Sequence, residues 1–346
     1  GSPTAAAFSA FEEVKIMNQY PEGKLPPGQL EGSIFRYCGA LRPEVLIGPG
    51  IGEDAALIRW PDGQYVAVAS DPIVGASEGA GKFLVHINAN DIACKGGDPS
   101  FFIVTLLVPS KDGVPMVESL MKEIHEACLS IGAAVVGGHT ELTARYDRPV
   151  LVGTMMGPTR YVHRATDIRP GDRLILTKHV GLEGMAILAS DRPDLLGEAL
   201  GKDGVDEARQ WLNSISVLQE AKTLRDIARF LHDPTEGGVG GGISEIMRLS
   251  GLGVELEYGK IPLSPLTVRA QKHLGFDPLH LISSGVLLAV VAPEHEEEAL
   301  SRLARKGIRA ASVGRMTDGK GNCPEDVKEE LWGLLARSGG GSRNDI

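Results

Sequence analysis

Clustered cysteines, clustered basic residues and long apolar runs are all missing from this chain of 346 residues. Its four cysteines are isolated from one another, and no CxxC or Cys/His cluster occurs, which argues against structural zinc and a disulfide framework. The net charge is −10 and no basic stretch is interleaved with aromatics, so a nucleic-acid-binding protein is not expected. No apolar run reaches the roughly 18–20 residues that a membrane-spanning helix needs.

The N-terminal residues also lack the pattern of a secretory signal. The segment GSPTAAAFSAFEEVKIM has no basic region followed by a long apolar core. We therefore expect a cytoplasmic protein that has no membrane partner. Residues 1–44 are weakly patterned and predict a helix or two with a mobile arm, while residues 326–346 predict a tail with a disordered end.

The composition is that of a soluble globular protein, with 42% hydrophobic and 23% charged residues. The length predicts two domains, each with its own core. Strand and helix patterns are mixed along the chain, which predicts an α/β fold, and a turn signature at Arg169–Asp172 marks a boundary. We place the first domain at residues 45–162 and the second at residues 163–325.

The first domain has the clearest local patterns. Phe101–Val108 is a continuous apolar run that predicts a buried strand, and apolar residues recur at helical spacing over about 115–131. Tyr65–Ser70 predicts a strand that ends on Asp71-Pro72, and Ala133–Val136 predicts one that ends on Gly137–Thr140. In the second domain, residues 206–231 predict one long amphipathic helix.

One segment concentrates polar residues within an apolar sequence, Gly81–Pro99 (GKFLVHINANDIACKGGDP). As a helix it would place Asn88 and Asp91 on one side, with Lys95 one turn beyond Asp91. Buried amides and carboxylates must be satisfied by hydrogen bonds or ions. The segment fits either a buried polar network that holds a loop or a bound ion with its counter-groups. Its Cys94, like Cys128, has the surroundings of a core thiol.

Four other polar motifs stand out, and each alone fits a turn or a helix cap. They are Gly52–Ala56, Ser70–Pro72, Gly137–Thr140 and Asp233–Gly238. Together they place carboxylates beside glycine backbone at strand ends. A metal-bridged polyphosphate site requires this combination, because carboxylates bind the metal and backbone N–H groups bind the phosphates. The motif GxxxxGK[ST] is absent, and no convincing dinucleotide fingerprint occurs, so neither a P-loop nor a Rossmann site is expected.

These motifs, with Gly81-Lys82 and Asn90-Asp91, occur in the order seen in the aminoimidazole ribonucleotide (AIR) synthetase superfamily, which the chain resembles over roughly residues 45–320. That superfamily includes thiamine-monophosphate kinase, selenophosphate synthetase and the hydrogenase-maturation protein HypE. HINANDIACKGGDP, GGHTE and DPTEGG resemble the HypE-like branch most. The resemblance implies a two-domain PurM-like α/β (α+β) fold, a homodimer paired through its N-terminal domains, and ATP with Mg²⁺ in the cleft.

The resemblance also implies roles for individual residues. Asp54, Asp71 and Asp91 would hold Mg²⁺ ions that bridge the phosphates. Lys82 would neutralise phosphate charge, and Asp233 would act with Asp91 and Lys82 in catalysis. The implied nucleotide-binding set comprises Asn88, Asn90, Gly137, Gly138, His139, Thr140, Thr235, Gly237 and Gly238.

Three positions depart from the HypE pattern. His139 stands where an acidic residue is usual, and Glu236 stands where HypE has an arginine, which removes a bidentate phosphate donor. HypE ends in a cysteine-bearing tail, whereas this sequence ends SGGGSRNDI and its last cysteine is Cys323. We therefore do not expect dehydration of a carboxamide on a terminal thiol.

The function implied is ATP- and Mg²⁺-dependent phosphoryl transfer to an unidentified small acceptor, linked to hydrogenase maturation and to a maturation-protein partner. The acceptor pocket is expected at the loops Lys178–Gly184 and Leu281–Gly285. Two alternatives stay open. One is a non-catalytic, nucleotide-binding dimer that serves as a scaffold in metallocentre assembly. The other is a small-molecule kinase that resembles thiamine-monophosphate kinase.

Overall fold

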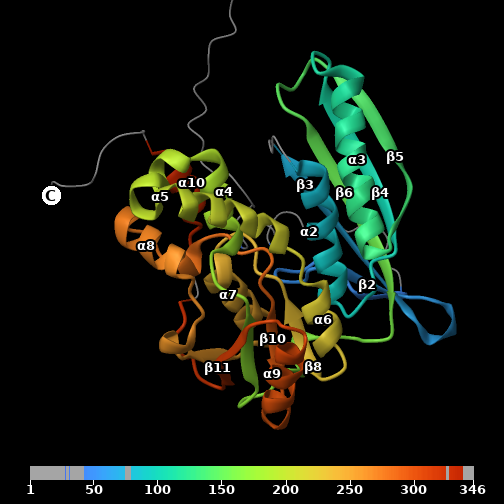
Figure 1. Cartoon of the computed structure of the whole chain (residues 1–346). Helices are drawn as coiled ribbons and strands as arrows, with labels where there is room; N and C mark the ends of the chain where they lie inside the picture. The colour runs from blue at the N-terminus through green and yellow to red at the C-terminus, as the bar shows by residue number, and fades with distance from the viewer. Residues whose placement is uncertain (1–27, 29–30, 32–42, 75–78, 325–326, 338–346) are drawn as a thin grey trace, which may run out of the picture.

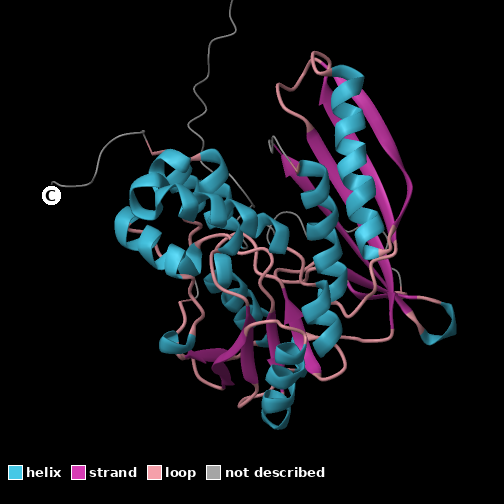
Figure 2. Cartoon of the chain, in the orientation of Figure 1, coloured by secondary structure: helices cyan, strands magenta, loops and turns pink. Residues whose placement is uncertain are grey.

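The computed structural model describes residues 28, 31, 43–74, 79–324 and 327–337. Our predictions for a helical or mobile N-terminal arm and for a disordered end to the tail fall largely outside these residues. Within them, two β-sheets are each packed against helices, which confirms the predicted α/β fold (Figures 1 and 2). Among the described residues, no helix is long and apolar enough to cross a membrane.

The first sheet has six strands in the order β1-β2-β3-β6-β4-β5. All neighbours are antiparallel except β4 and β5, which run parallel. The helices α2 (Ala80–Cys94) and α3 (Gly113–Ile131) pack against the sheet, and α3 confirms the helix predicted at about 115–131. The strands are β1 (Val45–Ile47), β2 (Ala56–Arg59), β3 (Tyr65–Val74), β4 (Phe101–Pro109), β5 (Ala134–Thr143) and β6 (Val150–Thr159).

The second sheet has five antiparallel strands in the order β8-β10-β7-β11-β9. They are β7 (Arg173–Thr177), β8 (Ala228–His232), β9 (Gly253–Leu256), β10 (Leu288–Val291) and β11 (Ala310–Thr317). The helices of this half are α4 (Leu182–Asp191), α5 (Pro193–Gln210), α6 (Leu218–Leu224), α7 (Gly238–Ser250), α8 (Pro265–Leu274), α9 (Glu296–Arg305) and α10 (Leu331–Leu335).

The second sheet is buried on both faces. Leu174 and Leu176 of β7 pack into one apolar cluster together with α7, whereas Ile175 between them packs into another with α6 and α9. The last residues of α2, Ala93 and Cys94, join this second cluster. The C-terminal end of α2 is therefore packed into the second half of the chain, and α2 connects the two halves (Figure 1).

Four strand and helix predictions need correction. The run in β4 is buried on one face only, since Phe101 and Ile103 are exposed while Phe102 and Val104 pack under the helices. The single helix predicted at residues 206–231 is wrong. That stretch holds the end of α5, the 3₁₀ turn η4 (Trp211–Ser214), α6 and most of β8. The apolar pattern is continuous because successive elements each bury apolar residues, those of α5 in one cluster and those of α6 in another.

Two further strands are longer than predicted. β3 continues through Asp71-Pro72 to Val74, beyond the residues that pair with β2. Among the described residues, one side of the strand has no neighbour in the sheet there, and proline is tolerated. β5 continues through Gly137–Thr140 to Thr143. A Cβ atom at Gly138 would lie 1.9 Å from the Val104 carbonyl oxygen of β4, so glycine is needed there for close packing of the two strands.

Candidate functional site

Helix α2 carries a row of buried polar side chains. Asn88, Asn90, Asp91 and Lys95 are all buried, which confirms that the segment is a helix with an internal polar face. The helix begins after Gly79, whose φ of 74° is left-handed. Because burial of such groups is costly, each needs a partner on a neighbouring element.

Four carboxylates come together beside α2. Asp54 precedes β2, Asp71 lies in β3, Asp91 in α2, and Asp233 follows β8. Burial raises the pKa of Asp91 well above its ordinary value, and the charges of Asp233, Asp71 and Asp54 raise it further. Residues that are far apart in the sequence thus form one acidic cluster between the two halves of the chain.

His232 links this cluster to α7. Its Nδ1 lies 2.6 Å from Asp54 Oδ1 and its Nε2 lies 2.7 Å from Glu245 Oε2. Burial alone would lower the pKa of His232, but the two carboxylates raise it well above its ordinary value. Both ring nitrogens face carboxylate oxygens, an arrangement that favours the protonated ring. Sequence reasoning missed His232, although it directly precedes the predicted Asp233.

The two asparagines of α2 act on the backbone. Asn88 Oδ1 accepts from the Asp71 amide at 3.0 Å, and its Nδ2 donates to the Leu84 carbonyl at 2.9 Å, so Asn88 fixes β3 where Asp71 emerges. Asn90 Nδ2 donates to the Ile215 carbonyl at 2.8 Å, and its Oδ1 accepts from the Val217 amide at 2.9 Å. These bonds hold the segment before α6. The nucleotide-binding roles of Asn88 and Asn90 stay predictions.

Two lysines of this region also have partners within the chain. Lys95 is fully buried, forms an ion pair with Glu53, and has Nζ 5.0 Å from the centre of the Phe230 ring. Lys82, in the first turn of α2, donates from Nζ to Asn213 Oδ1 at 2.8 Å. Its predicted contact with phosphate is not tested by this bond, which lies at the surface between the two halves.

Cys94 lies beside the same carboxylates. The thiol is buried, as predicted for a core cysteine, and its Sγ is the donor to Asp233 Oδ1 at 3.5 Å. Burial raises the pKa of Cys94 well above its ordinary value, and the charges of Asp233, Asp54 and Asp91 raise it further. The sequence shows Cys94 near Asp91 but does not show its proximity to Asp233.

The N-terminus of α7 is capped by a distant part of the chain. Gly237 is left-handed with a φ of 79°, and its amide donates to Glu329 Oε2 at 2.5 Å. Glu329 Oε1 also accepts from the Ile282 amide at 3.2 Å. Burial raises the pKa of Glu329, and the charge of Glu236 adds to this effect. Gly237, which the family resemblance places in the nucleotide-binding set, therefore has its amide bonded to a carboxylate of the protein itself, at a helix end that favours anions.

The remaining predicted nucleotide residues lie in two places. Thr235 precedes α7, and its carbonyl accepts from the Gly238 amide at 3.0 Å. Gly137, Gly138, His139 and Thr140 lie within the exposed strand β5, and His139 Nε2 is 3.5 Å from Glu141 Oε2. The nucleotide-binding roles of these residues stay predictions.

The loops predicted to form an acceptor pocket are packed together. Lys178 has a left-handed φ of 55°, and its Nζ donates to the carbonyls of Ser216 and Gly285, both at 2.7 Å. Nζ also forms an ion pair with Glu220 at 2.8 Å. Lys178 thus ties the loop after β7 to the segment that Asn90 holds, and the predicted acceptor role of this loop stays untested.

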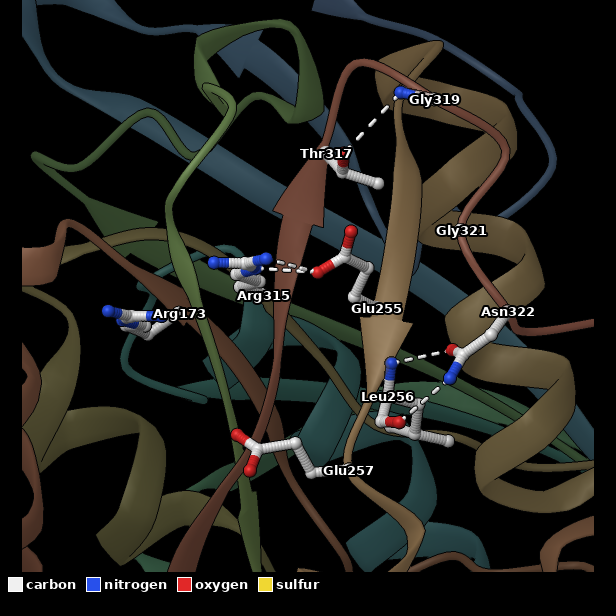
Figure 3. Close-up of a pocket in the computed structure, with 9 residues that line it drawn as sticks. All are labelled: Arg173, Glu255, Leu256, Glu257, Arg315, Thr317, Gly319, Gly321 and Asn322. Atoms are coloured by element: carbon white, nitrogen blue, oxygen red, sulfur yellow. Dashed lines mark hydrogen bonds and ion pairs between the residues drawn. The ribbon is translucent and has the colours of Figure 1, made fainter.

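A separate cavity of about 610 Å³ lies on the second sheet (Figure 3). Figure 3 shows Arg315 of β11 facing Glu255 of β9, with Arg315 Nε 2.7 Å from Glu255 Oε2. Its lining residues are Arg173, Glu255, Leu256, Glu257, Arg315, Thr317, Gly319, Gly321 and Asn322. None of these belongs to the acidic cluster, so we do not assign this cavity to the same site.

The acidic cluster fits a divalent cation. Asp54 Oδ1 is bonded to His232, whereas Oδ2 is buried and has no hydrogen-bond partner among the described residues. Carboxylate oxygens are the ligands that Mg²⁺ prefers, and a cation would offset the repulsion between Asp91 and its acidic neighbours.

Family models match both halves of this chain. The N-terminal domain of AIR synthase related proteins matches residues 52–159, and their C-terminal domain matches residues 169–323. The chain belongs to the AIR synthase related family. The resemblance seen in the motif order is thereby confirmed. Both matched stretches lie within the domains that we predict at residues 45–162 and 163–325, and the bounds themselves stay predictions.

Two relatives of this AIR synthase related protein carry hydrogenase-maturation names. It is 31% identical over 302 residues to the hydrogenase expression/formation protein HupE of Azotobacter chroococcum mcd 1, covering 83% of this chain and 84% of the relative. It is 30% identical over 302 residues to the carbamoyl dehydratase HypE of Azotobacter vinelandii, with the same coverage.

Solved structures share the fold. A HypE in complex with ATP has a TM-score of 0.63 at 20% identity, covering 86% of this chain and 88% of that one. A HypE–HypF complex gives a TM-score of 0.64 at 23% identity, covering 78% and 88%. AaThiL complexed with AMPPCP and TMP gives 0.65 at 19% identity, covering 78% and 86%. At these identities the likeness concerns the fold, and it confirms the PurM-like two-domain prediction.

Proposed function

We propose that this AIR synthase related protein is a HypE-like enzyme that uses ATP and Mg²⁺ to transfer a phosphoryl group to a small acceptor. The observation that carries the proposal is the convergence of Asp54, Asp71, Asp91 and Asp233 at the contact between the two halves. Such a group of buried and half-buried carboxylates is costly unless a cation neutralises it. Bound Mg²⁺ would supply charge neutralisation for the phosphates.

The main task of the residues in this cluster would be to hold Mg²⁺ and the carboxylates that bind it in fixed positions. Asp54, Asp71 and Asp91 would hold Mg²⁺, and Asn88 keeps the Asp71 backbone fixed through its bond to the Asp71 amide. His232 restrains Asp54 through Oδ1 and leaves Oδ2 for the ion. Phosphoryl transfer asks for little covalent chemistry from a protein, so positioning of this kind is what the reaction requires.

The names of relatives support a nucleotide and a place in metallocentre maturation. One structural neighbour is HypE bound to ATP and another is ThiL bound to AMPPCP and TMP, so the same fold holds nucleotides in both. The HypE–HypF complex supports a maturation protein as partner. The chemical class of the acceptor is open, because Lys178 and its neighbours are engaged in packing and offer no diagnostic group.

We also propose a homodimer formed through the first sheet. β5 is an edge strand of ten residues that is exposed along nearly its whole length, and apolar Phe101 and Ile103 are exposed on its neighbour β4. Val135, Val136 and Leu142 of β5 are exposed as well. In a monomer, a long exposed edge strand beside an apolar surface favours aggregation. Pairing of two copies would bury both the edge strand and the apolar surface.

Nucleotide binding measured by calorimetry tests the enzyme proposal. We expect ATP to bind with Mg²⁺ present, to lose affinity on chelation, and to bind at least about tenfold more weakly to Asp91→Asn. Asp167→Asn is the control, since Asp167 is exposed in a turn outside the acidic cluster. Failure of the wild-type chain to bind ATP with Mg²⁺ would refute the proposal.

Glu329 keeps a second candidate function open, namely a nucleotide-binding scaffold without turnover. Its carboxylate already accepts from the amide of Gly237 at the N-cap of α7, a residue predicted to bind the nucleotide. Product analysis separates the candidates. A kinase releases a phosphorylated product, a synthetase or dehydratase releases ADP and phosphate, and a scaffold binds ATP without releasing ADP with any acceptor.

A further inference from the structure

We propose that Cys94 is a metal ligand, so that the acidic cluster contains a site for a thiophilic divalent cation such as Zn²⁺ or Co²⁺. The proposal deepens the proposed function, because it concerns the metal preference of the same cluster. The ligand atoms of Asp54, Cys94 and Asp233 all lie within 4.8 Å of one another. They come from three separate parts of the chain, the loop before β2, the end of α2 and the loop after β8.

The spacing of two of these groups suits one ion. Cys94 Sγ lies 3.5 Å from Asp233 Oδ1. In a tetrahedral zinc site, a sulfur at about 2.3 Å and an oxygen at about 2.0 Å from the metal stand roughly 3.5 Å apart. The thiol and the carboxylate can therefore bind the same ion with little movement.

The third ligand has an atom available for the ion. The Asp54 side chain is 7% exposed, and its Oδ2 is buried without a hydrogen bond among the described residues. Its Oδ1 is held by His232, whose other nitrogen is held by Glu245. A carboxylate–histidine pair behind a ligand is a common way to orient a metal ligand, because it restricts the carboxylate to one direction.

Sulfur determines which cations the site prefers. A site made of carboxylates alone suits Mg²⁺, whereas a thiolate selects softer ions such as Zn²⁺. As the Sγ–metal bond forms, the thiol proton passes to solvent, and the cation takes over its electrostatic role between the carboxylates. No electron is transferred in this step. In this assignment Asp54 Oδ2 binds the thiophilic ion in place of Mg²⁺, so Asp71 and Asp91 alone hold Mg²⁺ for the nucleotide.

Cobalt spectroscopy tests this assignment on the full chain. In a variant with Cys38→Ser, Cys128→Ser and Cys323→Ser, Cys94 is the one thiol left. We expect one equivalent of Co²⁺ to give a sulfur-to-cobalt charge-transfer band that Zn²⁺ displaces and excess Mg²⁺ does not. Adding Cys94→Ser should remove the band and weaken Co²⁺ binding by at least about tenfold.

A second measurement covers the case in which Cys94→Ser does not fold. The X-ray absorption spectrum of Co²⁺ in the single-cysteine chain should show one sulfur neighbour. Absence of sulfur there, or of the charge-transfer band, overturns the proposal, as does equal Co²⁺ affinity in a folded Cys94→Ser variant. ATP binding with Mg²⁺ is measured in the same chains. If ATP binds but no sulfur–cobalt bond forms, only this inference fails; if Cys94 binds Co²⁺ but ATP does not bind, only the proposed function fails.

Discussion

Buried charges near α2 fall into two groups. Lys95 is paired with Glu53, and His232 lies between Asp54 and Glu245, so these groups are balanced within the chain. Asp91, by contrast, is surrounded by further carboxylates. For an ion-paired group the cost of burial is offset by its partner, whereas an acidic group crowded by other carboxylates lowers stability until a cation binds. This contrast distinguishes the candidate site from the structural polar network around it.

His163 is a buried group whose protonation should control stability in acid. Burial lowers its pKa from 6.5 to about 4, and the charge of Lys95 adds to this effect. The folded state favours the neutral ring, so its contribution is present above the ordinary pKa of 6.5 and is lost as the pH falls toward 4. This one group should account for about 2 kcal/mol of lost stability between about pH 7 and pH 4.5.

Urea unfolding at a series of pH values measures this effect. His163→Gln cannot acquire the charge, so its stability should fall less steeply with acid than that of the wild type. His125→Gln, at an exposed position of α3, is the matched control and should follow the wild type. Parallel pH profiles for wild type and His163→Gln would contradict the assignment.

The motifs in the sequence predicted the acidic residues but not their partners. Asp54, Asp71, Asp91 and Asp233 were predicted because each stands in a short polar motif. The contact between Gly237 and Glu329 joins residues 92 positions apart, and no local pattern around Glu329 indicates it. Partners of this kind are determined by tertiary packing, which spacing along the chain does not report.

The segment between α5 and α6 is held from both sides by buried polar groups. Asn90 binds its backbone at Ile215 and Val217, and Lys178 binds the carbonyl of Ser216. Lys178 itself keeps a left-handed φ of 55°, which costs a non-glycine residue of the order of 1 kcal/mol. The bonds of Nζ offset that cost, so Lys178 and Asn90 together hold this segment.

Removal of the Lys178 amine should therefore destabilise the second half of the chain. Lys178→Met leaves Glu220, which is 3% exposed, as a buried carboxylate without its cation, at a cost of about 3 kcal/mol. The double variant with Glu220→Gln should recover part of this loss, because the buried charge is then removed as well. Urea unfolding of both variants gives the two values.

Lys222→Met serves as the control for this pair. Lys222 is exposed on the same helix as Glu220, so its loss should change stability by no more than about 0.5 kcal/mol. If Lys178→Met were no less stable than Lys222→Met, the Lys178 network would not hold the segment as described.

Local sequence patterns predicted an element correctly where it packs with one face on the sheet and leaves the other face exposed along its whole length. The helix at about 115–131 was recovered as α3, since its apolar positions face the sheet and its other side is exposed. The pattern at residues 206–231 failed because three separate elements, α5, α6 and β8, follow one another there and each buries apolar residues. The apolar run of β4 was interpreted as a buried strand, and one of its two faces is exposed in the single chain.

The exposed face of β4 and the edge strand β5 bear on the assembly of the molecule. Alternate residues of β4 face away from α2 and α3, which leaves Phe101 and Ile103 exposed next to β5. An interface of two identical copies places the same patch on both sides, so one substitution acts twice. We therefore expect the wild-type chain to have twice the mass of one chain in solution, and Ile103→Lys to be a monomer, because it buries a charge on both sides of the interface.

Size-exclusion chromatography with light scattering measures this mass. Leu129→Lys is the matched control. Leu129 is 66% exposed on α3, on the helical side of the sheet, so this variant also exchanges an exposed apolar residue for a charge but should remain a dimer. Melting of both variants establishes that the fold is intact. A monomeric wild type, or a dimer that persists in Ile103→Lys, would rule out pairing through β4 and β5, and the exposed apolar residues of these strands would then require a different partner.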